Sequence, residues 1–436
     1  MSKPYKQSKK IKLPLKVLIF PSGTEIGLEI YKSLKLLKEV EIFGASSVPF
    51  DHSDLLLKNK IHIPTVNSSG WIEKLNQVIK TKGIQYIFPA HDDVLLALSK
   101  ERENILAKIF LSPSFTCTLT RSKRKTYAHL QSHVKVPREI KSAQEVSSWP
   151  IFCKPDVGQG SQSAFKVMNT EELNRVLEDP RMLALEYLPG REFTVDCFSD
   201  RERGLLYCRA RERKQMKTGI ATWSAFDDRK IFKEFAETIC KQLEFHGTWF
   251  FQVKENGDGE LTLLEIAPRI AGTMSLSRVT GVNFPLLNIF EYERLPFEIS
   301  AQKFPVEIHR SFQNRYKHNL KIQKLYIDFD DTLLTRQGLN SDLVKLIIQF
   351  RNQKKRVELV TRHAGNLKMR LEKLGIRGLF HTIHHLKKDA PKSKVIKGKA
   401  SALIDDSFSE RMEVHLKRGI PVFDPSMIEL LFDERI

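Results

Sequence analysis

The stretch WFFQVKENGDGELTLLEIAPR, residues 249–269, predicts a β-hairpin. Two runs of apolar, aromatic and β-branched residues flank NGDG, whose Gly, Asn and Asp residues favour a tight turn. Side-chain alternation lets Gln252 and Glu265 face one side, with Arg269 just beyond the second strand. An amide and a carboxylate are oxygen ligands for Mg²⁺, and a guanidinium suits a polyphosphate. An ordinary amphipathic hairpin shows the same pattern, so the hairpin alone leaves both interpretations open.

A glycine-rich loop lies upstream, in FCKPDVGQGSQS at residues 152–163. Lys154 ends a predicted strand, and Gly158, Gly160 and Ser161 follow in the loop. Glycines let backbone amides approach phosphate oxygens closely, and a preceding lysine supplies a positive charge. A single loop of this kind is weak evidence for a phosphate site.

The order of three motifs is more specific than any one of them. LALEYLPGREFTVD, residues 183–196, stands between the loop and the hairpin and places acids on both sides of a Pro-Gly turn. This series resembles the ATP-grasp superfamily, most closely the ATP-grasp halves of the carbamoyl phosphate synthase large chain. In that family ATP lies between two lobes, and a carboxylate is phosphorylated to an acyl phosphate that an amine then attacks.

The resemblance implies a role for each matching residue. The residues expected to contact ATP are Lys123, Lys154, Gly158, Gly160, Ser161, Glu186, Leu188 and Glu192. The two lysines and the loop would meet the phosphates, Glu186 and Leu188 the adenine, and Glu192 the ribose. Gln252 and Glu265 would hold Mg²⁺, and Arg269 would face the transferred phosphate.

One position departs from the family pattern. The family usually has Asn two residues after the metal-binding Glu, and this chain has Ala267. The change removes an oxygen ligand for a second Mg²⁺, so it puts two-metal catalysis in doubt. Glu265 bridging both ions and a nucleotide-binding domain without catalysis are the two alternatives.

Length and composition limit the number and the kind of domains in the chain. With 436 residues, 41% hydrophobic and 28% charged, the chain is long enough for two to four globular domains. The net charge of +19 suits anionic partners, and only the first sixteen residues form a dense lysine run. Such a run is usually a solvated tail, so nucleic-acid binding through it is the less favoured interpretation.

Other features point to a cytoplasmic protein. Five cysteines, without a C-x-x-C pair, favour a reducing compartment and give no zinc site. No signal peptide or membrane span is visible, because the first apolar run has only four residues. The oligomeric state, a homo-oligomer included, stays open.

An α/β fold class is predicted throughout, with a basic tail over residues 1–15 and a pre-ATP-grasp α/β domain over 16–118. Gly23 and Gly27 lie where a first strand would turn into a helix. Their spacing makes a poor dinucleotide fingerprint, so we favour a tight turn near a substrate pocket. His91, Asp92 and Asp93, after a later strand, are candidates for that pocket.

The two-lobed α+β ATP-grasp domain is expected over residues 119–297. Between its motifs lies the basic segment RARERKQMKTGIATW, residues 209–223. Arg211 and Lys217 could clamp an anionic group of the substrate, or the segment could be a solvated strand. The sequence leaves both interpretations open.

After a polar connector over residues 298–322, a strand-like run ends in acids: LYIDFDDTLL, residues 325–334. Two carboxylates at alternate positions after a strand suit attack on phosphorus and proton transfer. This run resembles the first motif of the haloacid dehalogenase-like (HAD) phosphatases, and VELVTRH, PKSKVIK and SALIDDS follow in the order of that family. We therefore expect a Rossmann-like HAD domain over 323–436, whose short motif spacing leaves no room for a cap.

The resemblance implies a catalytic set for this domain. Asp328 would be the nucleophile that forms an aspartyl phosphate, and Asp330 the general acid/base. Thr361 would bond the phosphoryl group, and Lys392, in preference to Lys394, would neutralise it. The expected Mg²⁺ ligands are Asp328, Asp330, Asp405 and Asp406. His381, His384 and His385 lack a fourth ligand nearby, so we favour packing or surface roles for them.

Three functions fit these motifs. The leading hypothesis is a bifunctional enzyme, in which an ADP-forming carboxylate–amine ligase is fused to a Mg²⁺-dependent phosphatase of the same pathway. ATP, a carboxylate, an amine and a phosphate ester are then the small-molecule partners. The alternative is a phosphatase regulated by a nucleotide-sensing, catalytically weakened ATP-grasp domain. A phosphatase acting on nucleic-acid ends is the third, with the basic surface as its only support.

Overall fold

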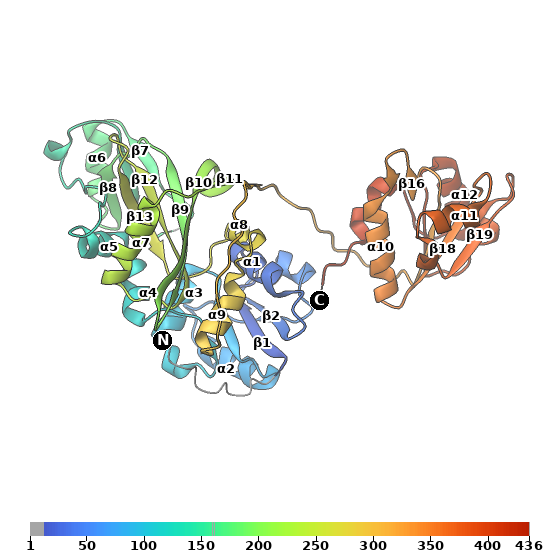
Figure 1. Cartoon of the computed structure of the whole chain (residues 1–436), viewed down its shortest axis with the longest axis horizontal. Helices are drawn as coiled ribbons and strands as arrows, with labels where there is room; N and C mark the ends of the chain where they lie inside the picture. The colour runs from blue at the N-terminus through green and yellow to red at the C-terminus, as the bar shows by residue number, and fades with distance from the viewer. Residues whose placement is uncertain (1–12, 159, 161, 436) are drawn as a thin grey trace. The chain divides into compact units, whose positions relative to one another are not determined.

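The computed structural model describes residues 13–158, 160 and 162–435, and its contacts divide these into two compact units (Figure 1). Unit 1 runs to Phe312, and unit 2 is Gln313–Arg435. The lysines of the N-terminal run before Leu13 and the expected phosphate contact Ser161 lie outside the described residues. Each unit is described by itself below.

Unit 1 begins with a parallel sheet in the order β3-β2-β1-β4-β5. Its elements are β1 (Leu15–Phe20), α1 (Glu25–Leu34), β2 (Val40–Ser46), β3 (Lys60–His62), α2 (Trp71–Lys82), β4 (Tyr86–Pro89), α3 (Asp92–Lys100) and β5 (Lys108–Ile109). The central strand β1 is buried almost throughout, as both faces of a parallel sheet are covered in such a fold. This alternation of strands and helices agrees with the α/β fold class predicted for this part of the chain.

A small antiparallel sheet follows, in the order β7-β6-β8. It contains β6 (Ile151–Pro155), β7 (Phe165–Val167) and β8 (Met182–Glu186), with α4 (Ser114–Thr120) and α5 (Lys123–Leu130) before it and α6 (Thr170–Leu177) within it. The strongly amphipathic α6 buries Leu173 and Val176 against the strands. This sheet holds the glycine-rich loop between β6 and β7.

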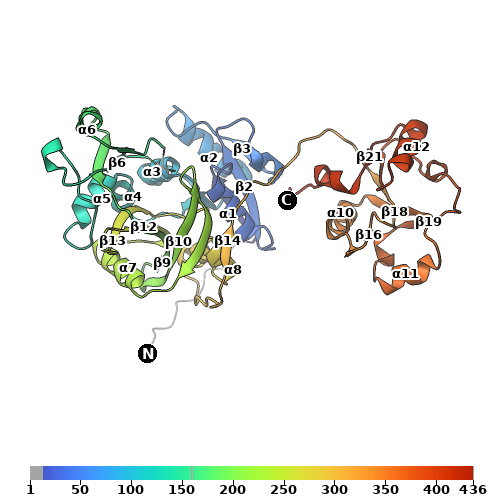
Figure 2. The same cartoon turned by 90° about the horizontal axis from the view of Figure 1, so that it is seen from above.

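The largest sheet has the order β13-β12-β9-β10-β11-β14. Its strands are β9 (Glu192–Asp200), β10 (Gly204–Lys217), β11 (Ile220–Asp227), β12 (Gly247–Glu255), β13 (Leu261–Ala267) and β14 (Glu307–His309). Helix α7 (Ile231–Gln242) covers one face (Figures 1 and 2). Trp249, Phe251 and Val253 of β12 join the core with α7, so the alternate residues Phe250, Gln252 and Lys254 point to the other face.

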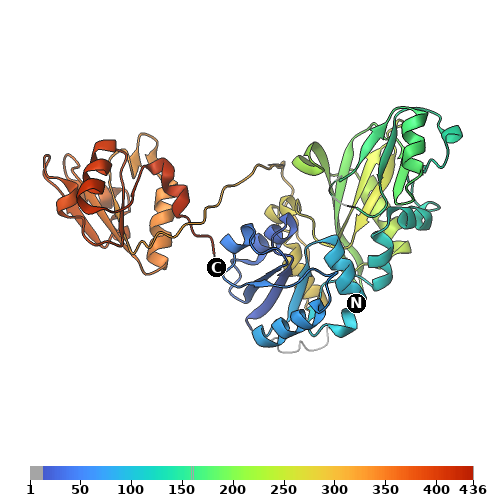
Figure 3. The ribbon, with the colours of Figure 1, turned by 180° about the vertical axis from the view of Figure 1, so that it is seen from behind.

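The polypeptide returns to the N-terminal sheet after the hairpin. Helices α8 (Ser275–Val279) and α9 (Phe284–Tyr292), in yellow, lie against the blue N-terminal elements in all three ribbon views (Figures 1, 2 and 3). One core cluster joins Ile30 and Tyr31 of α1 with Phe284 and Leu287 of α9. Strand β14, inside the expected connector, pairs with β11 at the edge of the large sheet. The connector is thus partly integrated into unit 1.

Unit 2 contains a parallel sheet in the order β19-β18-β15-β20-β21. Its elements are β15 (Lys324–Ile327), the hairpin β16 (Leu334–Thr335) and β17 (Gly338–Leu339), α10 (Ser341–Asn352), β18 (Arg356–Thr361), α11 (Leu367–Lys373), β19 (Thr382–His385), β20 (Ser401–Ile404), α12 (Phe408–Arg418) and β21 (Val422–Phe423). The small hairpin follows β15 directly, where the first acidic motif lies. No helix in the described part of the chain is long and apolar enough to cross a membrane.

Candidate functional site

Strand register assembles a polar row across the large sheet of unit 1. Glu265 of β13 pairs with Gln252 of β12, Gln252 with Thr194 of β9, and Thr194 with Arg211 of β10. Directly opposed residues of antiparallel strands project from the same face. The prediction that Gln252 and Glu265 face one side is therefore confirmed, and the register extends their row to Thr194 and Arg211.

A second polar row lies next to the first on this face. Glu192 of β9 pairs in register with Lys254 of β12, and its carboxylate lies 3.0 Å from Nε of Arg213. Arg213 Nη2 also donates to the Gly219 carbonyl oxygen at 2.7 Å. Sequence reasoning did not select Arg213, although it stands two residues after Arg211 on the same strand.

The small and large sheets of unit 1 enclose a cavity, called cavity 1, of about 150 Å³. Its lining includes the expected ATP and Mg²⁺ residues Lys123, Lys154, Gly158, Gly160, Glu186, Leu188, Glu192, Gln252 and Glu265. These residues come from α5, β6, the following loop, β8, the segment between β8 and β9, β9 and the β12–β13 hairpin. The structure thus brings together every described residue of the expected nucleotide set.

Two of the lysines that line cavity 1, Lys154 and Lys123, are held by neutral oxygens. Lys154 Nζ donates to Tyr127 Oη at 3.0 Å and to the Leu264 carbonyl oxygen at 3.4 Å. Lys123 Nζ donates to the carbonyl oxygens of Asp156 and Gly158 at 3.3 and 3.2 Å. Burial, reinforced by the nearby charge of Lys123, lowers the pKa of Lys154 to about 8. Burial also lowers the pKa of Lys123, and the charge of Glu265 opposes this effect at both lysines.

Part of the lining of cavity 1 is apolar. It includes the side chains of Phe152, Leu185, Leu188 and Leu264. Glu186 ends β8, and its Oε1 accepts a hydrogen bond from the Arg138 backbone N–H at 3.0 Å. An apolar slot with one polar edge is a common form of binding site for a small molecule.

A second cavity, called cavity 2, adjoins cavity 1 and measures about 250 Å³. Both cavities are lined by Lys123, Gly158, Gly160, Arg213, Gly219, Gln252 and Glu265. Cavity 2 also reaches the N-terminal sheet, where Thr24, His91 and Asp92 line it. A molecule in cavity 2 would therefore meet a molecule in cavity 1 at these shared residues.

Arg269 lines cavity 2 and is paired with an acid of the N-terminal sheet. Its Nε and Nη2 donate to the two carboxylate oxygens of Asp92, each at 2.7 Å. Burial acts to raise the pKa of Asp92, but Arg269 holds that pKa below its ordinary value. His91 and Asp92 thus lie at the expected pocket, whereas Asp93 pairs with Arg121 and is not part of either lining.

The glycines after β1 are required by packing. A Cβ on Gly23 would lie 2.3 Å from the Asp51 carboxylate, and one on Gly27 would lie 2.6 Å from the Ser22 carbonyl oxygen. Neither glycine lines cavity 2, although Thr24 between them does. Gly23 lies in the turn between β1 and α1, which agrees with the tight-turn interpretation, whereas Gly27 lies in the first turn of helix α1.

The structure separates the two members of the suggested anion clamp. Arg211 is fully buried, pairs with Asp196 and lines cavity 2. Lys217 lies at the exposed end of β10 and lines neither cavity, with its Nζ 5.8 Å from the ring centre of Phe312. A joint clamp by Arg211 and Lys217 is therefore wrong, because six residues of extended strand carry the lysine away.

Ala267 follows Glu265 by two residues on the same face and lines cavity 2. It offers no side-chain oxygen where the family pattern expects an amide. Gln252 and Glu265 remain as an amide and a carboxylate oxygen donor in adjacent register, a set that fits Mg²⁺.

Unit 2 gathers acidic side chains at one sheet edge. Asp328 follows β15, and Asp405 and Asp406 follow β20, so all three lie at the carboxyl ends of adjacent parallel strands. One ligand atom from each lies within 4.8 Å of the others, which fits a hard cation. Three of the four expected metal ligands thus converge.

Lys392 lies between two of these acids. Its Nζ donates to Asp328 Oδ1 and to Asp405 Oδ2, both at 2.6 Å. Burial raises the pKa of Asp328 to about 7, against the opposing effect of Lys392. The two carboxylates raise the pKa of Lys392 although burial opposes them. Lys394 is exposed, so the structure favours Lys392 of the two lysines.

Asp330 turns away from the acidic cluster. Its carboxylate lies 2.9 and 3.0 Å from Nδ1 of His363, so its side chain is not in the expected metal-ligand position. Buried Thr361 accepts a hydrogen bond from the His363 backbone N–H at 3.1 Å. His363, two residues after Thr361 in VTRH, is the residue that sequence reasoning missed.

The three histidines of HTIHH make separate contacts. His381 directly precedes β19, and His384 and His385 lie on it. His381 accepts from the Val357 N–H at 3.0 Å, His384 pairs with Glu358 at 2.8 Å, and His385 contacts the His363 carbonyl oxygen at 2.8 Å. The interpretation of these side chains as packing and surface groups agrees with these contacts.

Comparison with known proteins adds a family match for unit 1. Residues 178–317 match the family model described as "ATP-grasp in the biosynthetic pathway with Ter operon". A search of curated proteins found no match. Because the matched residues end at 317, before the acidic cluster of unit 2, the family match says nothing about that cluster.

Solved structures share the fold at low sequence identity. N5-carboxyaminoimidazole synthetase from Staphylococcus aureus, in complex with ADP, is 16% identical over 68% of this chain and 82% of its own, with a TM-score of 0.56. L-amino acid ligase from Bacillus licheniformis is 17% identical over 66% and 76%, with a TM-score of 0.52. Biotin carboxylase from Campylobacter jejuni is 17% identical over 66% and 72%, with a TM-score of 0.51. The closer likeness to carbamoyl phosphate synthase stays a prediction.

Proposed function

We propose that unit 1, which has the fold of the ATP-grasp superfamily, is an ATP-dependent ligase that activates a carboxylate as an acyl phosphate and transfers it to an amine. The observation that carries this proposal is the junction of the two cavities. Lys123, Gln252 and Glu265 line both, so nucleotide phosphates and a second substrate would meet there. The names of the similar L-amino acid ligase and N5-carboxyaminoimidazole synthetase are consistent with this class.

The residues at this junction have separable tasks. Lys123 and Lys154 would bind phosphate oxygens, since their amino groups now contact only neutral oxygens. Gln252 and Glu265 would hold Mg²⁺, which neutralises charge on the phosphates when bound. Arg269, fixed by Asp92, would face the transferred phosphoryl group from the side of cavity 2.

The reaction would proceed in two displacements. A carboxylate oxygen attacks the γ-phosphorus, the bond to the β-phosphate oxygen breaks, and ADP leaves with the electron pair. The amine nitrogen then attacks the acyl carbon, the C–N bond forms as the acyl C–O bond breaks, and inorganic phosphate leaves with that electron pair, while the nitrogen loses a proton to phosphate or solvent. Because both substrates are bound in adjoining cavities, their reacting groups are already close and oriented when the reaction begins.

Trapping the acyl phosphate tests this proposal. The full chain is mixed with Mg²⁺-ATP, hydroxylamine and the small-molecule fraction of a cell extract, and hydroxamates are identified by mass. We expect ADP and a hydroxamate with the natural sequence, and neither with Glu265→Gln. Binding of ATP without any ADP or hydroxamate would instead favour the nucleotide-sensing alternative.

For unit 2 we propose Mg²⁺-dependent phosphatase activity. The contact of Lys392 with both Asp328 and Asp405, beside Asp406, is the observation that favours it. Asp328 would attack the phosphorus of an ester, and Asp330 would protonate the leaving oxygen after turning from His363. Water would then hydrolyse the aspartyl phosphate, with its proton passing to Asp330. Release of phosphate from p-nitrophenyl phosphate, abolished by chelating Mg²⁺, is the test.

A further inference from the structure

One donor of Arg211 has no acceptor among the residues that the structure describes. Nε and Nη2 donate to the carboxylate of Asp196 at 3.0 and 2.9 Å, and both residues are fully buried. Asp196 also accepts from Ser277 Oγ at 3.2 Å, so its carboxylate is held in place. The remaining nitrogen, Nη1, is closed to water. A buried donor left in this state is unfavourable and requires a physical explanation.

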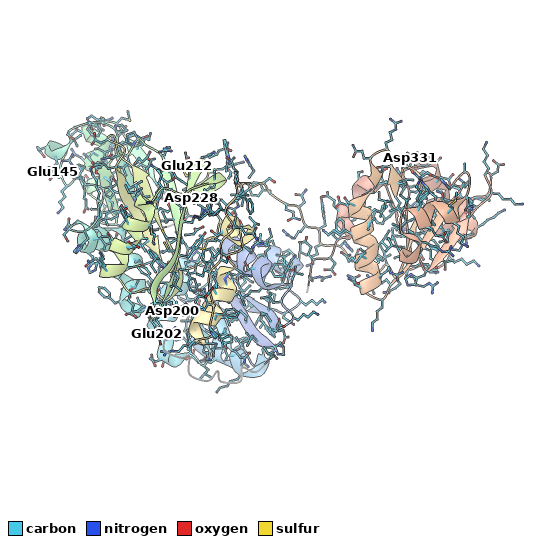
Figure 4. All side chains as sticks on the ribbon, viewed as in Figure 1. Glu145, Asp200, Glu202, Glu212, Asp228 and Asp331 are labelled. Atoms are coloured by element: carbon cyan, nitrogen blue, oxygen red, sulfur yellow. The ribbon has the colours of Figure 1, made fainter. Side chains whose placement is uncertain are left out.

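The neighbouring Arg209 forms the same kind of ion pair, but its guanidinium has an additional contact that Arg211 lacks among the described residues. Arg209 also pairs through Nε and Nη2, at 2.7 and 3.0 Å from Asp228 (labelled in Figure 4), and its Nη1 likewise lacks an acceptor. Its guanidinium carbon, however, lies 3.5 Å from the ring centre of Phe226, which supplies a cation–π contact. Arg209 lines neither cavity, whereas Arg211 lines cavity 2.

The register places Arg211 away from the reacting end of cavity 2. Thr194 separates it from Gln252 on the sheet face, so two strand spacings, about 10 Å, lie between the two backbones. A carboxylate that reacts with a nucleotide must lie at the junction near Gln252 and Glu265. A group that reaches Arg211 is therefore a different part of the same molecule.

The donors of cavity 2 indicate the charge of that group. Its basic lining residues are Arg121, Lys123, Arg211, Arg213, Arg269 and Arg310, and its acidic ones are Glu25, Asp92 and Glu265. Each arginine is already paired with a carboxylate: Arg121 with Asp93, Arg211 with Asp196, Arg213 with Glu192, Arg269 with Asp92 and Arg310 with Glu25. Among these arginines, Arg211 is the one with a buried nitrogen that has no acceptor in the described residues, and a charged donor favours an anionic ligand.

We propose that Nη1 of Arg211 binds a second oxyanion of the carboxylic substrate, so that the acid activated by unit 1 carries a further carboxylate or phosphate group. This inference rests on the proposed ligase function. The second group anchors the substrate and takes no part in phosphoryl transfer. A small shift of the cavity wall opens Nη1 to it, and the hydrogen bond then formed offsets the cost of the unmet donor.

The trapped hydroxamate identifies the acid and provides the test. We expect its mass to show a second acidic group, and phosphorus in the trapped compound separates phosphate from carboxylate. With the purified acid, Arg211→Met combined with Asp196→Asn should raise KM about 10- to 100-fold, the loss of one charge-assisted hydrogen bond, and change kcat less than threefold. Arg209→Met combined with Asp228→Asn is the matched control and should leave KM unchanged.

Two further measurements keep the test decisive. Esterifying the second acidic group should raise KM for the natural sequence by the same factor, without any variant that could misfold. The dissociation constant of Mg²⁺-ADP should stay within about twofold in both double variants. A trapped acid without a second anionic group, or equal KM values for the acid and its ester, overturns the inference while the ligase function stands. Absence of any hydroxamate and ADP overturns both.

Discussion

Lysines in the two units occupy opposite electrostatic environments. In unit 1, Lys154 and Lys123 lie close together in cavity 1 and contact neutral oxygens, so burial lowers the pKa of both. In unit 2, Lys392 lies between Asp328 and Asp405, and its pKa is raised. In the first arrangement the nearest carboxylates, such as Glu265, act on the lysines only from a distance, whereas in the second two carboxylates contact the lysine directly. A ligand is therefore expected to change the stability of unit 1 more than that of unit 2.

The acidic cluster of unit 2 gives the largest expected effect. Asp328→Asn should lower release of phosphate from p-nitrophenyl phosphate at least about 10³-fold, because the nucleophile is lost. The matched control is Asp331→Asn: Asp331 is exposed with φ of 56°, a conformation that Asn tolerates. Phosphate release should then stay within about twofold. Full activity in Asp328→Asn would exclude the proposed aspartyl phosphate.

Replacing Lys392 by Met and replacing Lys154 by Met should shift the free energy of unfolding in opposite directions. Lys392→Met leaves two buried carboxylates without their cation and should lower the free energy of unfolding by about 3–5 kcal/mol at pH 7. Lys154→Met removes a cation that burial disfavours and should raise it by about 1–3 kcal/mol at pH 7. Calorimetry of the full chain measures both, with separate transitions for the two units if they unfold independently.

The sign of the Lys154 effect can be checked with pH. The pKa of about 8 in the folded state lies below the value of 10.5 expected when unfolded, so the penalty is full below pH 8 and vanishes as pH rises through 10.5. The stability gained by Lys154→Met should therefore fade between pH 8 and 10.5. A gain that persists at pH 10.5 would contradict a charge-based cause.

Nucleotide affinity of unit 1 should depend on pH in the same range. An anion binds the protonated form of Lys154, so the dissociation constant of Mg²⁺-ADP should be flat below pH 8 and rise up to about tenfold per pH unit above it. Isothermal titration between pH 6.5 and 9.5 measures this slope. In Lys154→Met the affinity should be lower and the slope should disappear, which separates this lysine from other titrating groups.

The smallest expected effect concerns Ala267. Ala267→Asn adds the amide of the family pattern at the edge of cavity 2, beside the pair Gln252 and Glu265. If unit 1 is already an active ligase, ADP formation should change less than about threefold. A gain of tenfold or more would show instead that the present residue limits catalysis, and would favour the nucleotide-sensing alternative. Thermal stabilisation by Mg²⁺-ADP, measured in parallel, reports whether binding changes with turnover.

Local patterns in the sequence determined the elements and the composition of both candidate sites. Alternation in residues 249–269 predicts the hairpin and the common face of Gln252 and Glu265, since side-chain direction in a strand has a period of two. Acids placed directly after apolar strands predict the acidic edge of unit 2, because parallel strands end at the same edge. Motif order linked the glycine-rich loop to this hairpin, and cavity 1 contains both.

Tertiary structure alone decided the contacts that depend on residues distant in sequence. The pairing of Arg269 with Asp92, the position of Arg310 in cavity 2 and the turn of Asp330 toward His363 each join separate elements. The separation of Arg211 from Lys217 is of the same kind. Both are basic residues of one strand, but register and burial place only Arg211 beside Asp196 in the cavity. The sequence shows which charged residues the chain has, whereas packing decides which of them are buried away from water and which form ion pairs.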